Sequence, residues 1–481
     1  MDTLKIGRAQ IFLIVLLALA IGVSMTVGKS TVVLGAVLIS ALLVAAFLST
    51  RISLYLLVFS MLLGPEMMLG SGATADQTLG RGVTFRFDDF LLVVIGFVWM
   101  VKAAIHKEEA ALKATPLNGR MMFYVAVCFF ATMIGIVAGR VRPLNGFFFN
   151  LKYFEYFFLY FMVVNAIHTR KQAQGLITAS LVTCFLVTLY AIAQIPSGAR
   201  ASAPFEGEDG EPNTLGGYLV FMMSIALGFL LTPGSVSRKG PLIALMVTGS
   251  LALMATLSRA SFLAWAVVVL IVMLHISYRK PLIFALVLCL TASVPMWAPK
   301  TVRDRIMFTF GGQAAEKGQI KVGKMRIDTS TSDRLKSWQR SFEWWQRSPV
   351  WGGGITGGPF MDAMYPRVLV ETGLLGAAAF LALLWATFKV GVRTLKEARD
   401  DPPLRGLALG FMFGFIGMLV HAIGANTFII VRVMEPFWLF AALVVRGPAL
   451  EQTSEAAEAE AVPLPLVHAG QRNQLRSPSA G

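Results

Sequence analysis

Apolar runs long enough to cross a membrane dominate this sequence. Of its 481 residues, 56% are hydrophobic and only 14% are charged. Soluble domains carry roughly 25% charged residues, and a helix needs about 20 apolar residues to cross the hydrocarbon core of a bilayer. Because backbone polar groups inside a bilayer must bond within their own helix, the sequence predicts an all-α, polytopic transmembrane helical bundle. About fourteen runs qualify: residues 11–27, 31–49, 52–69, 90–105, 121–138, 148–167, 175–195, 215–232, 241–257, 260–277, 281–298, 368–388, 406–424 and 428–445.

The basic residues of the short loops fall on one side of this predicted bundle. Loops rich in Lys and Arg face the cytoplasm, and with fourteen spans both termini share that side. The net charge of +15 is therefore explained by membrane topology, and no nucleic acid is expected as a partner. The loop residues are Arg51, Lys107, Lys113, Arg120, Arg170, Lys171, Arg238, Lys239, Arg279, Lys280 and those of 389–405.

One long polar segment interrupts the series of spans. Residues 300–367 are cationic, and the predicted topology places them on the periplasmic face. The rule that basic loops face the cytoplasm holds for short loops and not for long segments. We therefore expect the positive charge of this segment to have another use, such as binding an anionic ligand. The segment also holds four of the nine tryptophans: Trp338, Trp344, Trp345 and Trp351.

Within that segment, residues 332–347 are predicted to form an amphipathic helix. One face carries an apolar stripe, and the opposite face is mainly cationic. Such a helix is expected to lie at the membrane interface. We interpret its tryptophans as interface anchors, with stacking on sugars as the alternative. The apolar stripe is Leu335, Trp338, Phe342 and Trp345, and the charged one is Lys336, Arg340, Glu343 and Arg347.

These features divide the chain into four predicted parts. Residues 1–298 form an N-terminal transmembrane bundle of about eleven spans, and residues 299–367 form the periplasmic loop. Residues 368–446 add about three spans. The tail, residues 447–481, lacks an apolar period and is expected to be disordered on the cytoplasmic side.

Ionisable residues within or beside the spans mark candidate sites, since burying them in a membrane is costly. Most of them fall toward the outer face. Arg259 sits at the tip of a tight helical hairpin, for which a snorkelling interfacial arginine is the alternative. Arg200 lies in an outer loop. Two further pairs, one turn apart, are interpreted as functional groups or as ion pairs that fix helix packing: Lys152 with Glu155, and Arg432 with Glu435.

Several arginines near one outer cavity suit a pyrophosphate. Guanidinium groups are permanently charged and bind phosphate through paired hydrogen bonds. A lipid-linked pyrophosphate would place its tail between helices and its phosphates at the headgroup level. The sequence has no Walker loop, no His-Glu-x-x-His and no Asp-x-Asp pair.

Four blocks of the sequence, taken in order, resemble the O-antigen ligase and Wzy-type polymerase family of bacterial envelope glycosyltransferases. The resemblance covers roughly residues 86–445. The blocks are Arg200 with PNTLGGY (212–218), TLSRASFLAW (256–265), DRLKSWQRSFEWWQRSPVWGGGI (333–355), and Asp362 with Tyr365 and ETGLLG (371–376).

The resemblance implies a GT-C-like helical glycosyltransferase of the bacterial inner membrane with a long periplasmic loop over an outward-facing cavity. It implies an undecaprenyl-pyrophosphate-linked glycan as donor, a second such glycan as acceptor, and no metal or cofactor. Membrane lipids and other polysaccharide export proteins are the further partners it suggests.

Polymerase and ligase differ at one position of the resemblance. Ligases of this kind carry a histidine nine residues before the glutamate of the ETGLLG-like block, and Asp362 stands there in this chain. The carboxylate favours a polymerase of lipid-linked repeat units. A ligase that transfers a finished glycan to a lipid or protein is the alternative, and a transporter is a further one that the charges gathered at one face disfavour.

The expected site follows from these roles. Asp362 is the candidate general base, and Arg259 is the candidate catalytic cation at the departing pyrophosphate. The remaining candidates are expected to bind substrate: Arg200, Arg334, Arg340, Asn213, Tyr365, Arg432 and Glu435.

Overall fold

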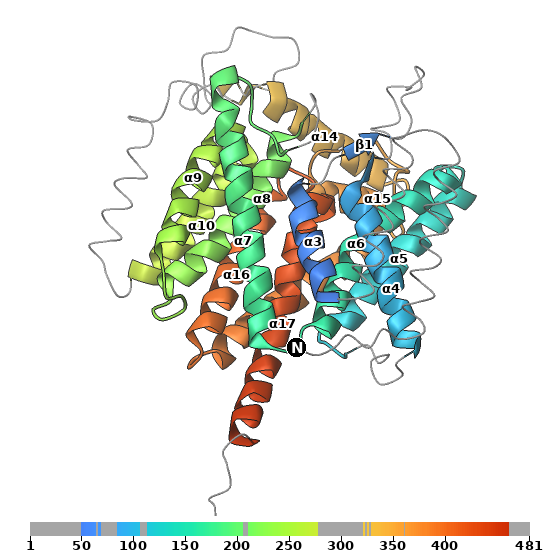
Figure 1. Cartoon of the computed structure of the whole chain (residues 1–481). Helices are drawn as coiled ribbons and strands as arrows, with labels where there is room; N and C mark the ends of the chain where they lie inside the picture. The colour runs from blue at the N-terminus through green and yellow to red at the C-terminus, as the bar shows by residue number, and fades with distance from the viewer. Residues whose placement is uncertain are drawn as a thin grey trace, which may run out of the picture.

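The computed structural model describes residues 50–63, 66–68, 84–105, 113–204, 210–277, 321–322, 325–326, 329–359 and 361–460. Within them the chain is a helical bundle with two short hairpins, β1–β2 and β3–β4 (Figure 1). The strands are β1 (Glu66–Met68), β2 (Thr84–Arg86), β3 (Lys321–Val322) and β4 (Met325–Arg326). The helices are α3 (Thr50–Leu63), α4 (Phe87–Ile105), α5 (Asn118–Val137), α6 (Pro143–Ala166), α7 (Arg170–Ala193), η1 (Ile195–Ser197), α8 (Pro212–Leu231), α9 (Gly240–Thr256), α10 (Arg259–Ser277), α14 (Thr329–Trp345), α15 (Met364–Glu397), α16 (Pro402–His421), η2 (Thr427–Ile429) and α17 (Val431–Glu460).

The prediction of a polytopic membrane bundle is confirmed, whereas the count of fourteen spans is not. Among the described residues, 7 helices are long and apolar enough to cross a membrane, and three apolar helices are shorter. The predicted spans 11–27, 31–49 and 281–298 lie outside the described residues. The seven lie within 118–137, 143–166, 170–197, 212–231, 364–397, 402–421 and 431–450.

Three predicted boundaries differ from the structure. The predicted span 52–69 extends too far toward the C-terminus, because α3 ends at Leu63. Glu66 instead pairs with Arg86 in β1–β2. The helix of the polar segment begins at Thr329 rather than 332. Helix α17 continues to Glu460, so the first part of the predicted disordered tail is helical, and residues 461–481 lie outside the described part.

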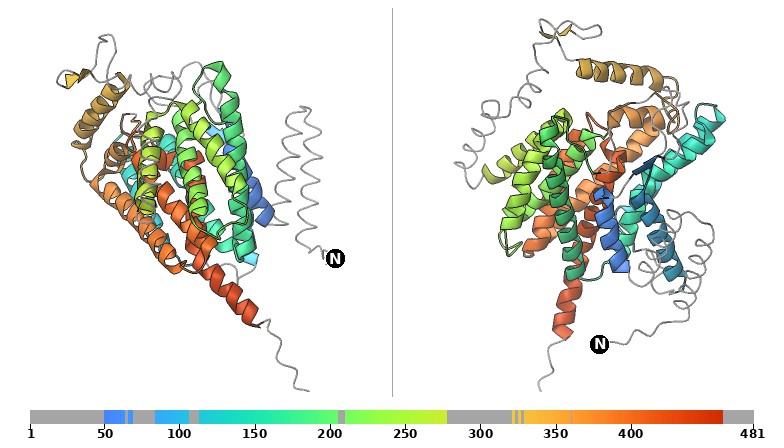
Figure 2. Two further views of the ribbon diagram at one scale, coloured as in Figure 1. Left: turned by 90° about the vertical axis from the view of Figure 1, so that its left-hand side faces the viewer. Right: turned by 45° about the horizontal axis from the view of Figure 1, so that its top comes forward.

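Those loops predicted to face the cytoplasm that the structure describes, such as 167–169, 232–239 and 398–401, lie at one end of the bundle (Figure 1). There an Arg170 guanidinium nitrogen lies 3.0 Å from a carboxylate oxygen of Asp401. Nearby, the backbone N–H of Lys113 donates to the side-chain oxygen of Asn165. Helix α14 lies at the opposite end (Figures 1 and 2). The bundle therefore has one end rich in basic loops and one end covered by α14.

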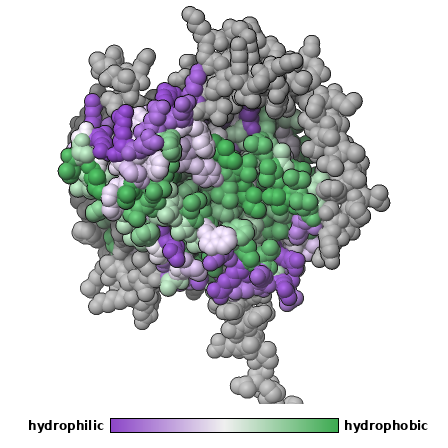
Figure 3. Space-filling model, turned by 180° about the vertical axis from the view of Figure 1, so that it is seen from behind, coloured by the Kyte–Doolittle hydropathy of each residue, from purple (hydrophilic) through white to green (hydrophobic). Residues whose placement is uncertain are grey.

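The outer surface of the bundle is apolar at mid-height. Seen from behind, a broad hydrophobic belt runs between hydrophilic patches above and below it (Figure 3). Large apolar side chains are exposed on several helices, for example Phe130 of α5, Phe158 of α6 and Trp385 of α15. A soluble protein rarely exposes so large a continuous apolar surface, and this belt is the surface expected to contact lipid.

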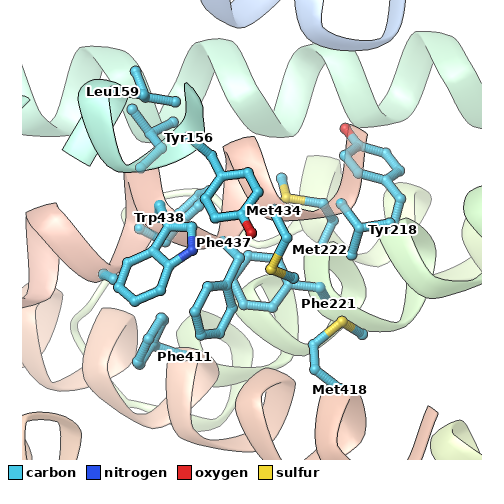
Figure 4. Close-up of a cluster of buried hydrophobic side chains, with 14 of the residues drawn as sticks. Tyr156, Leu159, Tyr218, Phe221, Met222, Phe411, Met418, Met434, Phe437 and Trp438 are labelled. Carbon is cyan, nitrogen blue, oxygen red and sulfur yellow. The ribbon is translucent and has the colours of Figure 1, made fainter. Parts of the chain in front are cut away.

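Aromatic and sulfur-containing side chains fill the centre of the bundle between α6, α8, α16 and α17 (Figure 4). The Phe157 and Trp438 rings are 4.9 Å apart at 79°, and the Phe411 and Phe437 rings are 5.4 Å apart. Lipid tails are as apolar as these side chains, so close packing rather than water exclusion holds such helices together.

Helices α8 and α16 approach each other through glycines. Gly406, Gly410 and Gly414 recur every four residues on α16 and face α8. A Cβ at Gly410 would lie 2.7 Å from the Cα of Ile225, closer than real atoms allow. Small residues at this spacing let two membrane helices pack with their backbones in contact. The pair forms the centre of the bundle, from which α16 leads to the end that carries α14.

We predict that Gly410→Ala separates α8 from α16 and destabilises the protein by about 1–3 kcal/mol, the usual range for overpacking. The thermal midpoint of the purified protein in detergent measures this. Gly119→Ala is the matched control, since a Cβ there meets nothing within 4 Å. Equal midpoints for the two variants would contradict the role assigned to the glycines.

Candidate functional site

The turn between α9 and α10 carries Arg259, as the sequence predicted. Helix α9 ends at Thr256, Leu257 adopts a left-handed conformation at φ 49°, and α10 begins at Arg259. The backbone N–H of Ser258 donates to Thr256 Oγ1 at 3.2 Å. A left-handed conformation is strained for a branched residue, so the surrounding contacts must hold this turn in place.

The loop that contains Arg200 is pinned to the same turn. The backbone N–H of Ala201 donates to the carbonyl oxygen of Ala255 at 3.0 Å, and Nε of Arg200 donates to that of Thr256 at 3.0 Å. Arg200 is exposed and Arg259 is half-buried. The structure thus brings together two arginines that lie far apart in the sequence.

Asn213 joins this turn from the first turn of α8. Its side-chain oxygen accepts a hydrogen bond from Oγ of Ser258 at 2.7 Å. The two sequence blocks that carry Arg200 with Asn213 and Arg259 therefore meet at one end of the bundle.

Arg432 and Glu435 are buried rather than open to a ligand, with 1% and 0% of their surfaces exposed. Nη1 of Arg432 donates to the carbonyl oxygen of Pro204 at 2.9 Å. This bond ties the start of α17 to the loop that follows Arg200. We interpret Arg432 as an anchor for that loop, which is a different role from the substrate contact predicted from the sequence.

Asp362 is exposed and lies on a segment attached to the end of α16. Its neighbour Met361 accepts a hydrogen bond from Nδ2 of Asn426 at 2.6 Å through its carbonyl oxygen. The backbone N–H of Met364 donates to Ala422, and the Tyr365 hydroxyl donates to the carbonyl oxygen of Leu419 at 2.7 Å. Tyr365 therefore serves here as an anchor of this segment, and Asp362 is the group left at the surface.

Asp362 and the two arginines are linked through the end of α16. His421 is the last residue of that helix, and its Nε2 lies 3.0 Å from Oγ of Ser261 on α10. The residues directly after it hold the Asp362 segment. The structure thus assembles these candidates around one helix end, with the arginines on the α10 side and the carboxylate on the α15 side.

Helix α14 rests on the Asp362 segment through one face. Ser341 is buried and its hydroxyl donates to the Met361 sulfur. On the outward faces Arg340 is exposed, and Trp338 and Phe342 are 41% and 53% exposed. Trp338 and Phe342, two members of the apolar stripe predicted from the sequence, therefore face away from the bundle. Arg334 lies in the first half of α14, and its side chain is outside the described part.

The glycine-rich loop after α14 is fastened along α15. The backbone N–H groups of Gly353 and Gly354 donate to the carbonyl oxygens of Val370 and Glu371 at 2.8 and 2.9 Å. Gly373 interrupts α15 with a φ of 64°, which frees these carbonyls for the loop. Each glycine here avoids a clash, because a Cβ at Gly354 would lie 2.9 Å from the Val141 side chain.

A buried charged cluster underlies that loop, and the sequence analysis missed it. Nε of Arg367 lies 3.1 Å from Oε1 of Glu371, and its Nη2 lies 2.6 Å from the Tyr153 hydroxyl. The backbone N–H of Thr356 donates to the same carboxylate at 3.4 Å. The sequence did contain a signal for this cluster, because Arg367 and Glu371 are opposite charges four residues apart in an apolar helix. The cavity beside this cluster is lined by Cys128 and Ile355 among others and has a volume of about 10 Å³, roughly that of one water molecule.

The predicted pair Lys152 and Glu155 is present and has a third member. Nζ of Lys152 lies 3.7 Å from Oε1 of Glu155 and in closer contact with Asp89 of α4. The pair therefore ties α6 to the first turn of α4, which supports the interpretation as an ion pair that fixes helix packing.

We predict that Glu371→Ala destabilises the protein by about 3 kcal/mol, because Arg367 would be left as a buried charge without its partner. Arg367→Ala should cost a similar amount, and the double variant should cost clearly less than the sum. Thermal unfolding in detergent gives the three values. Additive effects would show that the two side chains do not act as a pair.

Comparison with known proteins bears on the same part of the chain. Residues 244–381 match the model of the Wzy_C family, described as O-Antigen ligase. The match includes Arg259, α14, the glycine-rich loop and Asp362, whereas Arg200 and Arg432 lie outside it. No curated protein matches the sequence. The resemblance inferred from the motifs is confirmed over these residues, and the chain is a multi-pass membrane protein.

Proposed function

We propose that this protein is a membrane glycosyltransferase that polymerises undecaprenyl-pyrophosphate-linked repeat units at the periplasmic face. The observation that carries the proposal is the joint fixing of Arg200 and Arg259 on the α9–α10 turn. This turn lies at the end of the bundle opposite the basic loops. If those loops face the cytoplasm, as the charge rule indicates, then Arg200, Arg259 and Asp362 face the periplasm.

The two arginines suit the departing pyrophosphate. The reaction moves negative charge onto the leaving group, and fixed guanidinium groups stabilise such charge as it develops. Arginine stays charged and contacts phosphate oxygens through two parallel hydrogen bonds. The first turn of α10, which begins with Arg259, adds the positive end of a helix dipole. The lipid tail would lie along the apolar belt of the bundle.

Asp362 suits the role of general base. The acceptor hydroxyl oxygen attacks the anomeric carbon of the donor, a new glycosidic bond forms, and the bond from that carbon to the pyrophosphate oxygen breaks. The electron pair leaves with the pyrophosphate, and the hydroxyl proton passes to the Asp362 carboxylate. Asp362 is exposed on a segment held at two backbone positions, Met361 and Met364, so it is both accessible and fixed.

Helix α14 is placed to border this site. It rests on the Asp362 segment, and its Arg340, Trp338 and Phe342 side chains are exposed. We propose that Trp338 and Phe342 enter the outer leaflet, with Arg340 at the level of the lipid phosphates or the glycan. Arg334, one turn before Trp338, is proposed to face the same region.

The alternative is a ligase that transfers a finished glycan to a lipid or protein acceptor. The description of the matching family, O-Antigen ligase, favours it. Asp362 in place of the ligase histidine favours the polymerase. The two enzymes would share the donor site and differ in the acceptor, so their products distinguish them.

We predict that Arg259→Ala and Asp362→Asn abolish polymer formation while the protein still folds and inserts. Loss of a positioned cation costs about 10²–10³ in rate, and loss of a general base about 10²–10⁴. In cells that carry each variant, a gel of the surface polysaccharide should show single repeat units, and lipid-linked repeat units should accumulate.

Arg393→Ala is the control, since this arginine is exposed near the opposite end of α15 and pairs with Glu397. Long chains that remain unattached in the two variants would identify a ligase. Polymer of normal length in both would remove Arg259 and Asp362 from the mechanism.

A further inference from the structure

A continuous chain of hydrogen bonds runs through the buried side chains below the arginine turn. Thr427 Oγ1 lies 2.7 Å from Nδ1 of His421, and Nε2 of His421 lies 3.0 Å from Oγ of Ser261. Oγ of Ser261 lies 2.8 Å from that of Ser258, which donates to Asn213 at 2.7 Å. The imidazole is fully buried, with 0% exposed. The chain crosses four elements, η2, α16, α10 and α8, and the proposed reaction uses none of its members as a chemical group.

The direction of donation in this chain follows from counting protons. Asn213 accepts through its amide oxygen, so the one hydroxyl proton of Ser258 is used there. Ser258 can then only accept from Ser261, whose own proton is thereby used. Nε2 of His421 must donate to Ser261, and in a neutral imidazole Nδ1 accepts from Thr427. Every bond points from η2 toward α8, and the order of donors fixes the tautomer and the orientation of the ring.

Two adjacent glycines of α8 make room for the network. A Cβ at Gly217 would lie 2.9 Å from Cε1 of His421, and one at Gly216 would lie 2.7 Å from Cβ of Ser261. Both glycines belong to the PNTLGGY block that also supplies Asn213. The same short stretch of α8 therefore provides the last acceptor of the chain and the space for its central members.

The network passes through Ser258, the residue directly before Arg259 in the turn. Ser258 lies between the strained Leu257 and Arg259, and its Oγ also accepts the backbone N–H of Ser261 at 3.4 Å. Its backbone N–H bonds to Thr256, the residue whose carbonyl oxygen anchors Arg200. A shift of Ser258 would therefore displace the backbone from which the Arg259 side chain extends, together with the carbonyl oxygen that holds Arg200.

The other end of the network begins beside the Asp362 segment. Thr427 follows Asn426 directly, and Nδ2 of Asn426 holds the carbonyl oxygen of Met361 at 2.6 Å. The imidazole therefore stands between the turn that carries the arginines and the backbone that carries the carboxylate. A histidine that only filled a core position would have no need to bridge these two attachments.

We propose that His421 is a positioning residue that sets the α9–α10 turn, and with it Arg259 and Arg200, against the Asp362 segment. The inference rests on the proposed binding of pyrophosphate by these arginines. His421 is buried and acts through Ser261 and Ser258 rather than by touching the substrate.

A double-variant cycle tests the inference through binding of undecaprenyl pyrophosphate, without a glycan, to the purified full chain in lipid nanodiscs. His421→Leu keeps an apolar side chain of similar reach but breaks the network. We expect it to weaken binding roughly tenfold, a typical coupling between residues of one network. In the background of Arg259→Ala the same change should weaken binding by clearly less, since the residue it positions is gone.

Two further variants complete the design. His421→Gln can donate to Ser261 and accept from Thr427 through its amide, so it should restore binding to within about threefold of the wild type. His275→Leu, on the exposed surface of α10, is the matched histidine control and should bind normally. If His421→Leu fails to fold, Ser261→Ala replaces it in the cycle, because loss of one hydroxyl interrupts the same chain.

The outcomes separate this inference from the proposed function. Weakened binding by Arg259→Ala, with normal or fully additive effects of His421→Leu and Ser261→Ala, would overturn the inference alone. Failure of His421→Gln to restore binding beyond the level of His421→Leu would do the same. Normal binding by Arg259→Ala would overturn the assignment of the pyrophosphate site and, with it, the inference.

Discussion

The left-handed conformation of Leu257 is the constraint on which the candidate site depends. Such a conformation costs a non-glycine residue of order 1–3 kcal/mol and persists where the surroundings fix it. Here the fixing contacts come from both sides: Ala201 bonds to Ala255, and Ser258 bonds to Asn213. Because the turn is this short, Arg259 starts α10 directly beside the anchor of Arg200. A longer, relaxed loop would leave the two guanidinium groups without a fixed relation.

The packing of α8 and α16 at backbone distance supports that turn. The glycines at 406, 410 and 414 bring α16 against α8, and the outer end of α16 then delivers His421 to the space beside Gly217. The packing of the apolar centre and the hydrogen bonds at the end of α16 are thus parts of one arrangement. In a membrane, where water exclusion gives little drive for helix association, close backbone packing is the main source of such rigidity.

The sequence predicted those features that depend on local pattern. The apolar runs, the hairpin tip at Arg259 and the amphipathic helix of the polar segment each follow from residues close together in the chain, and the structure has them. The sequence could not predict that Arg432 faces the carbonyl of Pro204, or that His421 reaches Ser261. Those contacts depend on which faces of distant helices meet, and apolar composition alone leaves that choice open. The short strand at Glu66 was missed because its pairing with Arg86 is likewise not local.

The ionisable residues at the end of the bundle that carries the α9–α10 turn differ in burial. This difference in burial bears on their roles. Glu371 and Arg432 are buried and bonded to the loops they fasten, and Arg367 is half-buried and bonded to Glu371 and to Tyr153 of α6. Removing such groups from water is so costly that their geometry is fixed by the contacts that compensate them, which suits a scaffold and not a ligand that comes and goes. Asp362 is exposed and attached through the backbone groups of Met361 and Met364, and Arg200 is exposed with its Nε bonded to the carbonyl oxygen of Thr256. An exposed group can reach a substrate, and this difference in burial, rather than the presence of charge in a span, distinguishes the proposed reacting groups from their supports.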